Sequence, residues 1–554
     1  MSEITGGEAV YRVLAANGID TVFGLLGGSM LELYDAMYRG GRIRYIGARD
    51  ERAAGHMADA WARMTGKPGV VLGAQAGPGV VNLVTAVAEA YLAYSPLVVI
   101  AGAITRADQA KDTFQEVDQV ALFAPVAKRS VMVTDPSRLV PMLEDAIRLA
   151  NTGRRGPVVL HVPRDLFSYE IPEILPNPVI LARPGPAAPE DVASIAQMLS
   201  NARRPVIVAG GGFKWSQGRD ALTALADKLQ IPVVASTGHA DVMRHGHPWF
   251  AGQGGPRGNR VASRLTREAD VMVVLGARLG FNSTFHSNDY VGAETRIAHV
   301  DIEGSAVGRY FRAEIAAQGD ARQTALALLP VAERPECHDW RAAFRRDMET
   351  LSSERAAEAE IDTLPMHPRR ALAEIRTVLP ENAIVTLDTG NTCLQAADRL
   401  AHYAPMSLIT PLDFGLVGFG MPAAIGAKAA APDRPVIAIL GDGSMGYTMI
   451  EVQTAVSHKL AVVFVVLDNQ AWGAEKAYQQ EFFGGRLLGA EIESPRYDKF
   501  AELCGARGFW VDGPGGMGPA FDAALATGET CVIQCRIDPG ALMTLRKDLF
   551  KTAQ

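Results

Sequence analysis

The sequence predicts an α/β protein with three doubly wound domains, each built on a parallel sheet. The chain has 554 residues, of which 48% are apolar, and this length is too great for a single hydrophobic core. Short apolar runs rich in β-branched residues alternate along the whole chain with stretches of helical periodicity. Runs with so few polar positions are typical of strands buried on both faces by crossover helices.

The predicted strands extend from the first quarter of the chain to its end. One predicted crossover helix spans Glu51–Arg63. The strand-forming runs, in chain order, are VVLGAQ, PLVVIAGA, PVVLHV, PVIVAGGG, VMVVLGARL, IAHVDI, AIVTLDTG, VIAILGDG, AVVFVVLDN and CVIQCRI.

Two proline-rich stretches with few strands interrupt the alternation, Ile171–Pro189 and Arg334–Pro368. We interpret both as linkers, the second charged and helical in part. They predict an amino-terminal domain of residues 1–170, a central domain of residues 190–335 and a carboxy-terminal domain of residues 366–554. The first and third domains are candidates for related folds.

Composition narrows the functional classes. The net charge of −7 gives no field that would attract nucleic acid or an anionic membrane, so neither partner is expected. The first residues lack the pattern of a secretion signal, and no apolar run approaches the roughly 20 residues that span a bilayer. Of the five cysteines, Cys531 and Cys535 share one face of a strand, where we expect buried thiols. We expect a reducing, cytoplasmic setting.

A strand, turn and helix in VIAILGDGSMGYTMIEVQTA predict an anion site. Gly441 and Gly443 make the turn, so that backbone amides at the helix start can face phosphate oxygens. Asp442 is a hard oxygen ligand suited to Mg2+, and Asn469 ends the next strand, AVVFVVLDN. Because the carboxyl ends of neighbouring parallel strands meet at one sheet edge, both side chains can reach the same ion.

This segment resembles the diphosphate-binding motif of thiamine diphosphate (ThDP) enzymes. The resemblance implies that Gly441 to Ser444 hold the diphosphate of ThDP. It also implies that Asp442, Asn469 and the backbone carbonyl of Ala471 bind Mg2+. Many relatives have two asparagines where this chain has Asp468 and Asn469, but Asn469 falls at the ligand position.

A second segment, YIGARDERAAGHMADAWARMTGKPGV, resembles the first-domain motif of the acetohydroxyacid synthase-like family. In that family a glutamate contacts the aminopyrimidine ring of ThDP and stabilises the tautomer that takes up a proton. Glu51 fits this place, and Asp50 is its adjacent rival. Because Glu51 lies in the first domain and Asp442 in the third, the resemblance implies a cofactor between two subunits of a homodimer or homotetramer.

Other positions match the same family one by one. Val417 stands where the family has a bulky apolar residue beneath the bent cofactor. Gly77 and Asn82 resemble the loop near the pyrimidine end. Phe114 and Gln115, in DTFQEVDQV, resemble a pair that faces the substrate and takes part in catalysis.

The central domain carries a glycine run, Gly210 to Gly212, after the strand PVIVA. In relatives this domain binds FAD, an adenine nucleotide or neither. A plain strand-to-helix turn also explains the glycines, so the sequence leaves FAD open.

The reaction is predicted by resemblance alone. Acetohydroxyacid synthases have a tryptophan after the metal-binding asparagine where this chain has Tyr478. The segments WGAEK, FQEVDQ, TDPSRLV, VPRDLF and LGARLGFNSTF are similar to sulfoacetaldehyde acetyltransferases, which convert sulfoacetaldehyde and phosphate to acetyl phosphate and sulfite. Benzaldehyde lyase also shares WGA, but has two histidines where this chain has Leu26 and Ser29, the latter a candidate substrate contact.

Acetyltransferase chemistry requires groups that bind a sulfonate and a phosphate. Lys476 and Arg486 follow the metal motif closely and are candidates for binding these anions, although solvated charges on a helix are the commoner explanation of such residues. An acetolactate synthase-like carboligase or decarboxylase stays an alternative, as does a benzaldehyde lyase-like enzyme. A noncatalytic ThDP-binding regulator is a third class, and the pairing of Glu51 with Asp442 and Asn469 argues against it.

Overall fold

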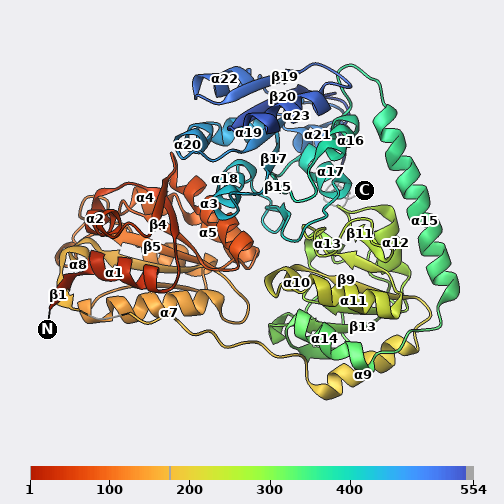
Figure 1. Cartoon of the computed structure of the whole chain (residues 1–554), viewed down its shortest axis with the longest axis horizontal. Coiled ribbons are helices and arrows are strands. Elements are labelled where there is room, and N and C mark those ends of the chain that lie inside the picture. Colours follow the sequence, from red (N-terminus) through yellow and green to blue (C-terminus); the bar gives the residue numbers. More distant parts are fainter. Residues whose placement is uncertain (1, 174–175, 545–554) are drawn as a thin grey trace. The chain divides into compact units, whose positions relative to one another are not determined.

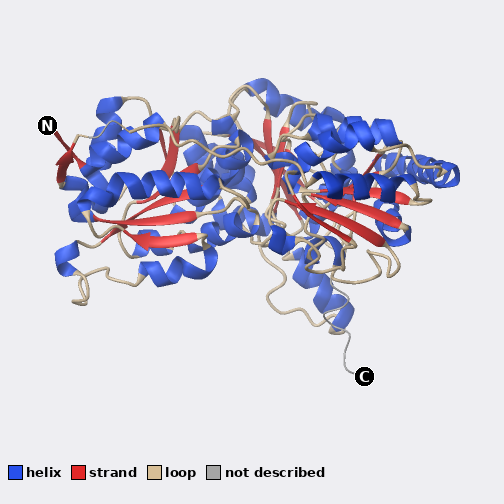
Figure 2. Ribbon diagram, turned by 90° about the horizontal axis from the view of Figure 1, so that it is seen from below, coloured by secondary structure: helices blue, strands red, loops and turns tan. Residues whose placement is uncertain are grey.

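Three six-stranded sheets form the fold, and every neighbouring pair of strands within them is parallel. Helices lie on the faces of the sheets (Figures 1 and 2), which confirms the predicted α/β class. The computed structural model describes residues 2–173 and 176–544. Its chain forms two compact units, one of residues 1–182, 421–433 and 448–462 and the other of the remaining residues.

The amino-terminal sheet has the order β3-β2-β4-β5-β7-β6. Its strands are β2 (Thr21–Leu25), β3 (Arg44–Gly47), β4 (Gly69–Gly73), β5 (Leu97–Ala103), β6 (Arg129–Met132) and β7 (Val158–Pro163). The helices around it are α1 (Gly6–Ala16), α2 (Leu31–Gly40), α3 (Glu51–Thr65), α4 (Pro78–Val81), α5 (Val84–Leu92), α6 (Gln119–Phe123), α7 (Leu139–Asn151) and α8 (Arg164–Ser168). Two short strands, β1 (Glu3–Thr5) and β8 (Glu170–Pro172), pair antiparallel beside it.

Helices α1 and α7 lie side by side on this sheet (Figure 1) and bury apolar faces against β4, β5 and β7. Leu14 and Leu143 belong to this core. A buried ion triad stabilises α3 and α5, because Arg63 donates to Asp59 at 2.6 Å and to Glu89 at 2.9 Å. Both carboxylates are fully buried, and Arg63 is the cation that pairs with each of them.

The central sheet has the order β11-β10-β9-β12-β13-β14, the arrangement of dinucleotide-binding folds. Its strands are β9 (Pro205–Ala209), β10 (Val233–Ala235), β11 (Phe250–Gln253), β12 (Val271–Leu275), β13 (Arg296–Asp301) and β14 (Ile315–Gln318). Its helices are α9 (Pro189–Ser200), α10 (Gly211–Trp215), α11 (Arg219–Leu229), α12 (Arg260–Glu268), α13 (Phe281–Thr284) and α14 (Ala321–Val331). The second predicted linker contains α15 (His338–Ala357), whose Trp340 and Phe344 pack into the central core.

The carboxy-terminal sheet has the order β16-β15-β17-β18-β20-β19. Its strands are β15 (Ile384–Leu387), β16 (Leu408–Ile409), β17 (Val436–Gly441), β18 (Val463–Asp468), β19 (Arg507–Val511) and β20 (Cys531–Arg536). Its helices are α16 (Pro368–Val378), α17 (Asn391–Arg399), α18 (Gly420–Ala430), α19 (Asp442–Thr448), α20 (Glu451–Ser457), α21 (Gly473–Phe482), α22 (Tyr497–Leu503) and α23 (Met517–Thr527). When the six strands of each sheet are numbered along the chain, the first and third sheets have the same spatial order, 2-1-3-4-6-5, as expected of related folds.

Cys531 and Cys535 are buried free thiols on β20, as predicted. In the part of the chain that the structure describes, no helix combines the length and apolar character needed to cross a membrane.

Candidate cofactor site

The register of β17 and β18 brings two of the predicted metal ligands, Asp442 and Asn469, to one edge of the sheet. Gly441 pairs with Leu467, so the residues that follow these two strands leave the sheet at the same edge. The backbone amide of Asn469 donates to Asp442 Oδ1 at 3.4 Å, and the Ser494 hydroxyl donates to Oδ2 at 2.6 Å. Asp442 and Asn469 are both buried.

The surroundings of Asp442 suit a cation. Burial, with a smaller contribution from the nearby Asp468, raises the pKa of Asp442 to about 6. The Asp442 carboxylate, the Asn469 amide oxygen and the Ala471 carbonyl are oxygen donors of the type that Mg2+ prefers. Among residues 2–173 and 176–544, no cluster of three or more His, Cys, Asp or Glu could hold a metal. A cation at Asp442 therefore needs further oxygens, such as those of a diphosphate.

The two glycines of the GDG turn have different surroundings. A Cβ at Gly443 would lie 2.6 Å from the Trp472 ring, so packing alone requires glycine there. A Cβ at Gly441 would meet no atom within 4 Å. Packing therefore does not explain the glycine at position 441, where the resemblance places the diphosphate.

Asp468, which replaces the asparagine of many relatives, has hydrogen-bond partners of its own. Its carboxylate accepts from the Gln470 side chain at 2.8 Å and from Gln534 at 2.9 Å. The departure from two asparagines therefore leaves Asn469 in its place beside Asp442.

Asp388 is a site residue that the sequence analysis missed. It follows β15, and its carboxylate accepts from the amides of Gly418 at 3.1 Å and Gly420 at 2.6 Å. The Ser444 hydroxyl also bonds to Asp388, whose pKa is raised by burial. One carboxylate thus anchors both the loop of the half-buried Val417 and the GDGS turn. An aspartate at the end of a buried strand was the available signal.

The predicted carboxylate is held at the start of α3. Asp50 caps this helix, accepting from Arg52 N at 2.8 Å and Ala53 N at 3.3 Å, whereas the Glu51 side chain is buried. Asn82 Nδ2 donates to Glu51 Oε2 at 3.0 Å. The structure therefore brings Glu51 and Asn82 together and assigns Asp50 to helix capping.

The loop at Gly77 lies beside the Phe114–Gln115 segment. Gly77 has a φ of +72°, and a Cβ there would lie 2.4 Å from the Gln115 carbonyl oxygen, so only glycine fits. Gln75 Nε2 donates to Gln115 Oε1 at 2.5 Å, while the Ser29 hydroxyl accepts from Ala76 N at 3.1 Å. Phe114 is 84% exposed.

The buried Gln119 side chain holds the Gly77 loop through a hydrogen bond, a role that the sequence analysis did not identify. Its Oε1 accepts from Gly77 N at 2.8 Å, and its Nε2 lies 3.2 Å from His161 Nδ1. Burial lowers the pKa of His161 to about 4, so the imidazole is neutral and can accept from Gln119. Ser130 lies on its other side, 2.9 Å from Nε2.

The predicted anion-binding residues lie on and after α21. Lys476 is buried and donates to Glu491 at 2.9 Å, so its ammonium is already paired. Arg486 is exposed. The Gln479 side chain, on α21, donates to the carbonyl of Leu488, which follows the helix, and accepts from the Leu488 amide. The Tyr478 ring lies 6.5 Å from that of Phe482. Of the two predicted cations, Arg486 is the more accessible to an anion.

The glycine run of the central domain has a packing role. A Cβ at Gly210 would lie 2.5 Å from the Gly276 carbonyl oxygen, and one at Gly212 would lie 2.6 Å from Gly276 Cα. The turn after β9 therefore packs backbone to backbone against the end of β12.

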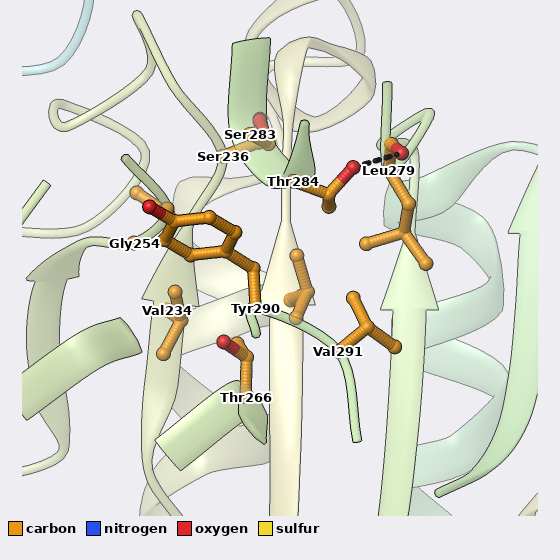
Figure 3. Close-up of a pocket in the computed structure, with 12 residues that line it drawn as sticks. Val234, Ser236, Gly254, Thr266, Leu279, Ser283, Thr284, Tyr290 and Val291 are labelled. Atoms are coloured by element: carbon orange, nitrogen blue, oxygen red, sulfur yellow. Dashed lines mark hydrogen bonds between the residues drawn. The ribbon is translucent and has the colours of Figure 1, made fainter. Parts of the chain in front are cut away.

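A cavity lies where β9 and β10 end, and Tyr290, Thr284 and Val291 line it together with strand residues (Figure 3). Its free volume is about 20 Å³, roughly the room that one water molecule requires. A flavin or an adenine nucleotide does not fit this cavity.

Three segments match family models. Residues 4–122 match "Thiamine pyrophosphate enzyme, N-terminal TPP binding domain", residues 192–328 match its "central domain" and residues 388–535 match its "C-terminal TPP binding domain".

Relatives that match over nearly their whole length include sulfoacetaldehyde acetyltransferases and acetolactate synthase large subunits. The chain is 33% identical to sulfoacetaldehyde acetyltransferase of Alcaligenes xylosoxydans xylosoxydans, over 96% of this chain and 93% of that protein. It is 34% identical to the enzyme of the same name from Castellaniella defragrans, with the same coverage. It is 32% identical to the probable acetolactate synthase large subunit of Methanocaldococcus jannaschii, over 98% of this chain and 93% of that protein.

Proposed function

This chain belongs to the thiamine pyrophosphate enzyme family, and we propose that it is an Mg2+-dependent enzyme of the sulfoacetaldehyde acetyltransferase type. The proposed reaction converts sulfoacetaldehyde and phosphate to acetyl phosphate and sulfite. The proposal that this chain is catalytic rests on the buried Glu51, which Asn82 holds, in a chain that also brings Asn469 against Asp442. The observation that favours this substrate is similarity to sulfoacetaldehyde acetyltransferases over nearly the whole chain.

Glu51 would act at the pyrimidine end. When bound, ThDP supplies a carbon nucleophile that adds to a carbonyl and allows an adjacent bond to break. The Glu51 carboxylate would accept a hydrogen bond from the pyrimidine ring and hold the proton that this chemistry moves. Asn82 fixes one carboxylate oxygen at 3.0 Å, and burial excludes water that would compete for the other.

The residues of the carboxy-terminal domain would hold the diphosphate end. Asp442, Asn469 and the Ala471 carbonyl would bind Mg2+, and the open face beside Gly441 would receive phosphate oxygens. Val417 would support the bent cofactor by packing, and Asp388 keeps its loop next to the GDGS turn.

Substrate contacts would come from the loops at the pyrimidine end and from α21. Gln75 Nε2 donates to the side-chain oxygen Oε1 of Gln115, which leaves the side-chain NH2 of Gln115 as a donor for a sulfonate or phosphate oxygen. Ser29 and the exposed Phe114 would line the same entrance. Arg486 and Tyr478 are further candidates, and Lys476 would contribute only if its pair with Glu491 opened.

We also propose a homodimer or homotetramer with the cofactor between subunits. Glu51 and Asp442 belong to different compact units of the chain, and the family resemblance assigns them to different subunits of one site. Light scattering with size-exclusion chromatography tests this, since a monomer that keeps full turnover contradicts it.

The substrate test supplies ThDP and Mg2+ with sulfoacetaldehyde plus phosphate, and in parallel with pyruvate alone. We expect sulfite and acetyl phosphate in equal amounts, and neither product from the Glu51→Gln variant. Acetolactate from pyruvate without sulfite release would instead support the second candidate, an acetolactate synthase, which similarity to the probable acetolactate synthase large subunit of Methanocaldococcus jannaschii favours.

A further inference from the structure

Helix α20 supplies acceptors for backbone amides just before Glu51. Strand β3 is an edge strand of its sheet, so alternate amides along its outer side have no partner strand. The amide of Gly47 donates to His458 Nε2 at 3.1 Å, and that of Arg49 donates to the two Glu451 oxygens at 3.0 and 3.3 Å. Glu451, the first residue of α20, and His458, which follows its last residue, therefore hold the amide at the end of β3 and one in the turn between β3 and α3.

Glu451 is committed to this contact. Its side chain is buried, and its remaining partner is Thr454, whose hydroxyl donates to Oε2 at 2.6 Å. Burial raises the pKa of Glu451 to about 7, and Asp50 adds to the rise while Arg49 opposes it. A carboxyl group is costly in such a place unless its oxygens have donors. An acidic residue at the start of a helix interacts favourably with the helix dipole even when it is exposed. The burial of Glu451 against the Arg49 amide therefore indicates a further role.

Acceptors on both sides of position 51 define the path of the backbone there. Asp50 fixes the amides of Arg52 and Ala53, and Glu451 fixes that of Arg49. We propose that Glu451 is a positioning residue for Glu51, because its buried carboxylate holds the turn on which Glu51 is carried. The inference rests on the proposed function of Glu51 and adds to it a residue from the carboxy-terminal third of the chain.

The test measures hydrogen–deuterium exchange at the thiazolium carbon of ThDP by NMR, using holoenzyme loaded with ThDP and Mg2+. Glu451→Ala removes the acceptor and is expected to slow exchange by roughly 10- to 100-fold, as a displaced catalytic group does. Glu451→Gln keeps an acceptor oxygen and is expected to retain most of the rate. Gln453→Ala is the matched control, because the Gln453 side chain accepts from the Arg49 side chain, at 3.2 Å, and not from the Arg49 amide.

Two further readouts separate positioning from a general loss of structure. Amide exchange measured by mass spectrometry should show lost protection at Arg49 in Glu451→Ala, and calorimetry should show ThDP affinity close to wild type. If Glu451→Ala does not fold, Thr454→Val tests the same contact, since it removes the hydroxyl that orients Glu451. A slower exchange rate in Thr454→Val is then the expected result.

Exchange at the wild-type rate in the folded Glu451→Ala, or in its substitute Thr454→Val, would overturn the inference. Equal losses in Glu451→Gln and Glu451→Ala would also overturn it, because the charge would then matter and not the acceptor. The Glu51→Gln variant distinguishes failure of the proposed function from failure of the positioning role of Glu451. If that variant keeps wild-type exchange, the proposed role of Glu51 fails. If it abolishes exchange while Glu451→Ala does not, only the positioning role of Glu451 fails.

Discussion

Replacement of Asp388 by alanine should loosen the Val417 loop and the GDGS turn, which we propose to hold the diphosphate end of ThDP. The carboxylate accepts from two buried amides, those of Gly418 and Gly420, and from the Ser444 hydroxyl. Each buried donor left without an acceptor costs about 1–3 kcal/mol, so the two amides together cost roughly 2–6 kcal/mol. For a domain of this size we expect the melting temperature of the transition that unfolds the carboxy-terminal domain to fall by about 5–20 °C.

Cofactor binding should weaken as well, because the Val417 loop and the GDGS turn lose their shared anchor. We expect the dissociation constant of ThDP in the presence of Mg2+ to rise about tenfold or more, which corresponds to about 1.4 kcal/mol. Scanning calorimetry of the apo-protein and titration calorimetry with ThDP measure the two effects. Asp362→Ala, at an exposed loop position, is the matched control and should change neither quantity.

Two results would refute the reasoning about Asp388. An unchanged melting temperature would mean that its carboxylate is not an anchor. A lower melting temperature with unchanged ThDP affinity would mean that the anchor stabilises the fold without shaping the cofactor site.

Further predictions concern packing, charge and the central domain. Gly443→Ala should place a methyl group against the Trp472 ring, lower the free energy of unfolding by about 1–3 kcal/mol and weaken ThDP binding measured by calorimetry. Wild-type affinity would show that the ring moves freely. Arg63→Met leaves the two buried carboxylates of its triad without their cation and should lower the free energy of unfolding by about 3–5 kcal/mol, measured by thermal denaturation. A stability equal to that of the wild type would contradict this explanation. The pKa of His161 is lowered to about 4 in the folded state, so the unfolded chain binds its proton more tightly: stability is complete above about pH 6.5 and falls by about 1.4 kcal/mol per pH unit from there towards pH 4. His161→Gln should remove that part of the pH dependence, and identical slopes of stability against pH would disprove it. The glycine run of the central domain has a packing role that needs no nucleotide, so we expect the purified protein to show no flavin absorption in the visible range, and a flavin band would contradict this.

Sequence reasoning identified the parts of the site whose residues are close along the chain. Asp442 and Asn469 are separated by one strand–helix–strand unit, and parallel pairing of β17 with β18 places them at one edge whatever surrounds them. Glu51, Gly77 and Asn82 were found through family resemblance, and the structure brings Glu51 and Asn82 into contact. The α/β class followed from apolar runs that only a doubly covered sheet can bury.

The sequence by itself determined the fold class, because the apolar periodicity encodes it, and it predicted the two ends of the cofactor site, one from local spacing and the other from family resemblance. The tertiary structure alone decided which side chains support those ends. Glu451 lies 402 positions from Arg49, and no local pattern distinguishes it from other acids at helix starts. Asp388, Gln119 and Glu451 are recognised only when the backbone amides that need acceptors are known, and these depend on which strands lie at an edge and which loops meet.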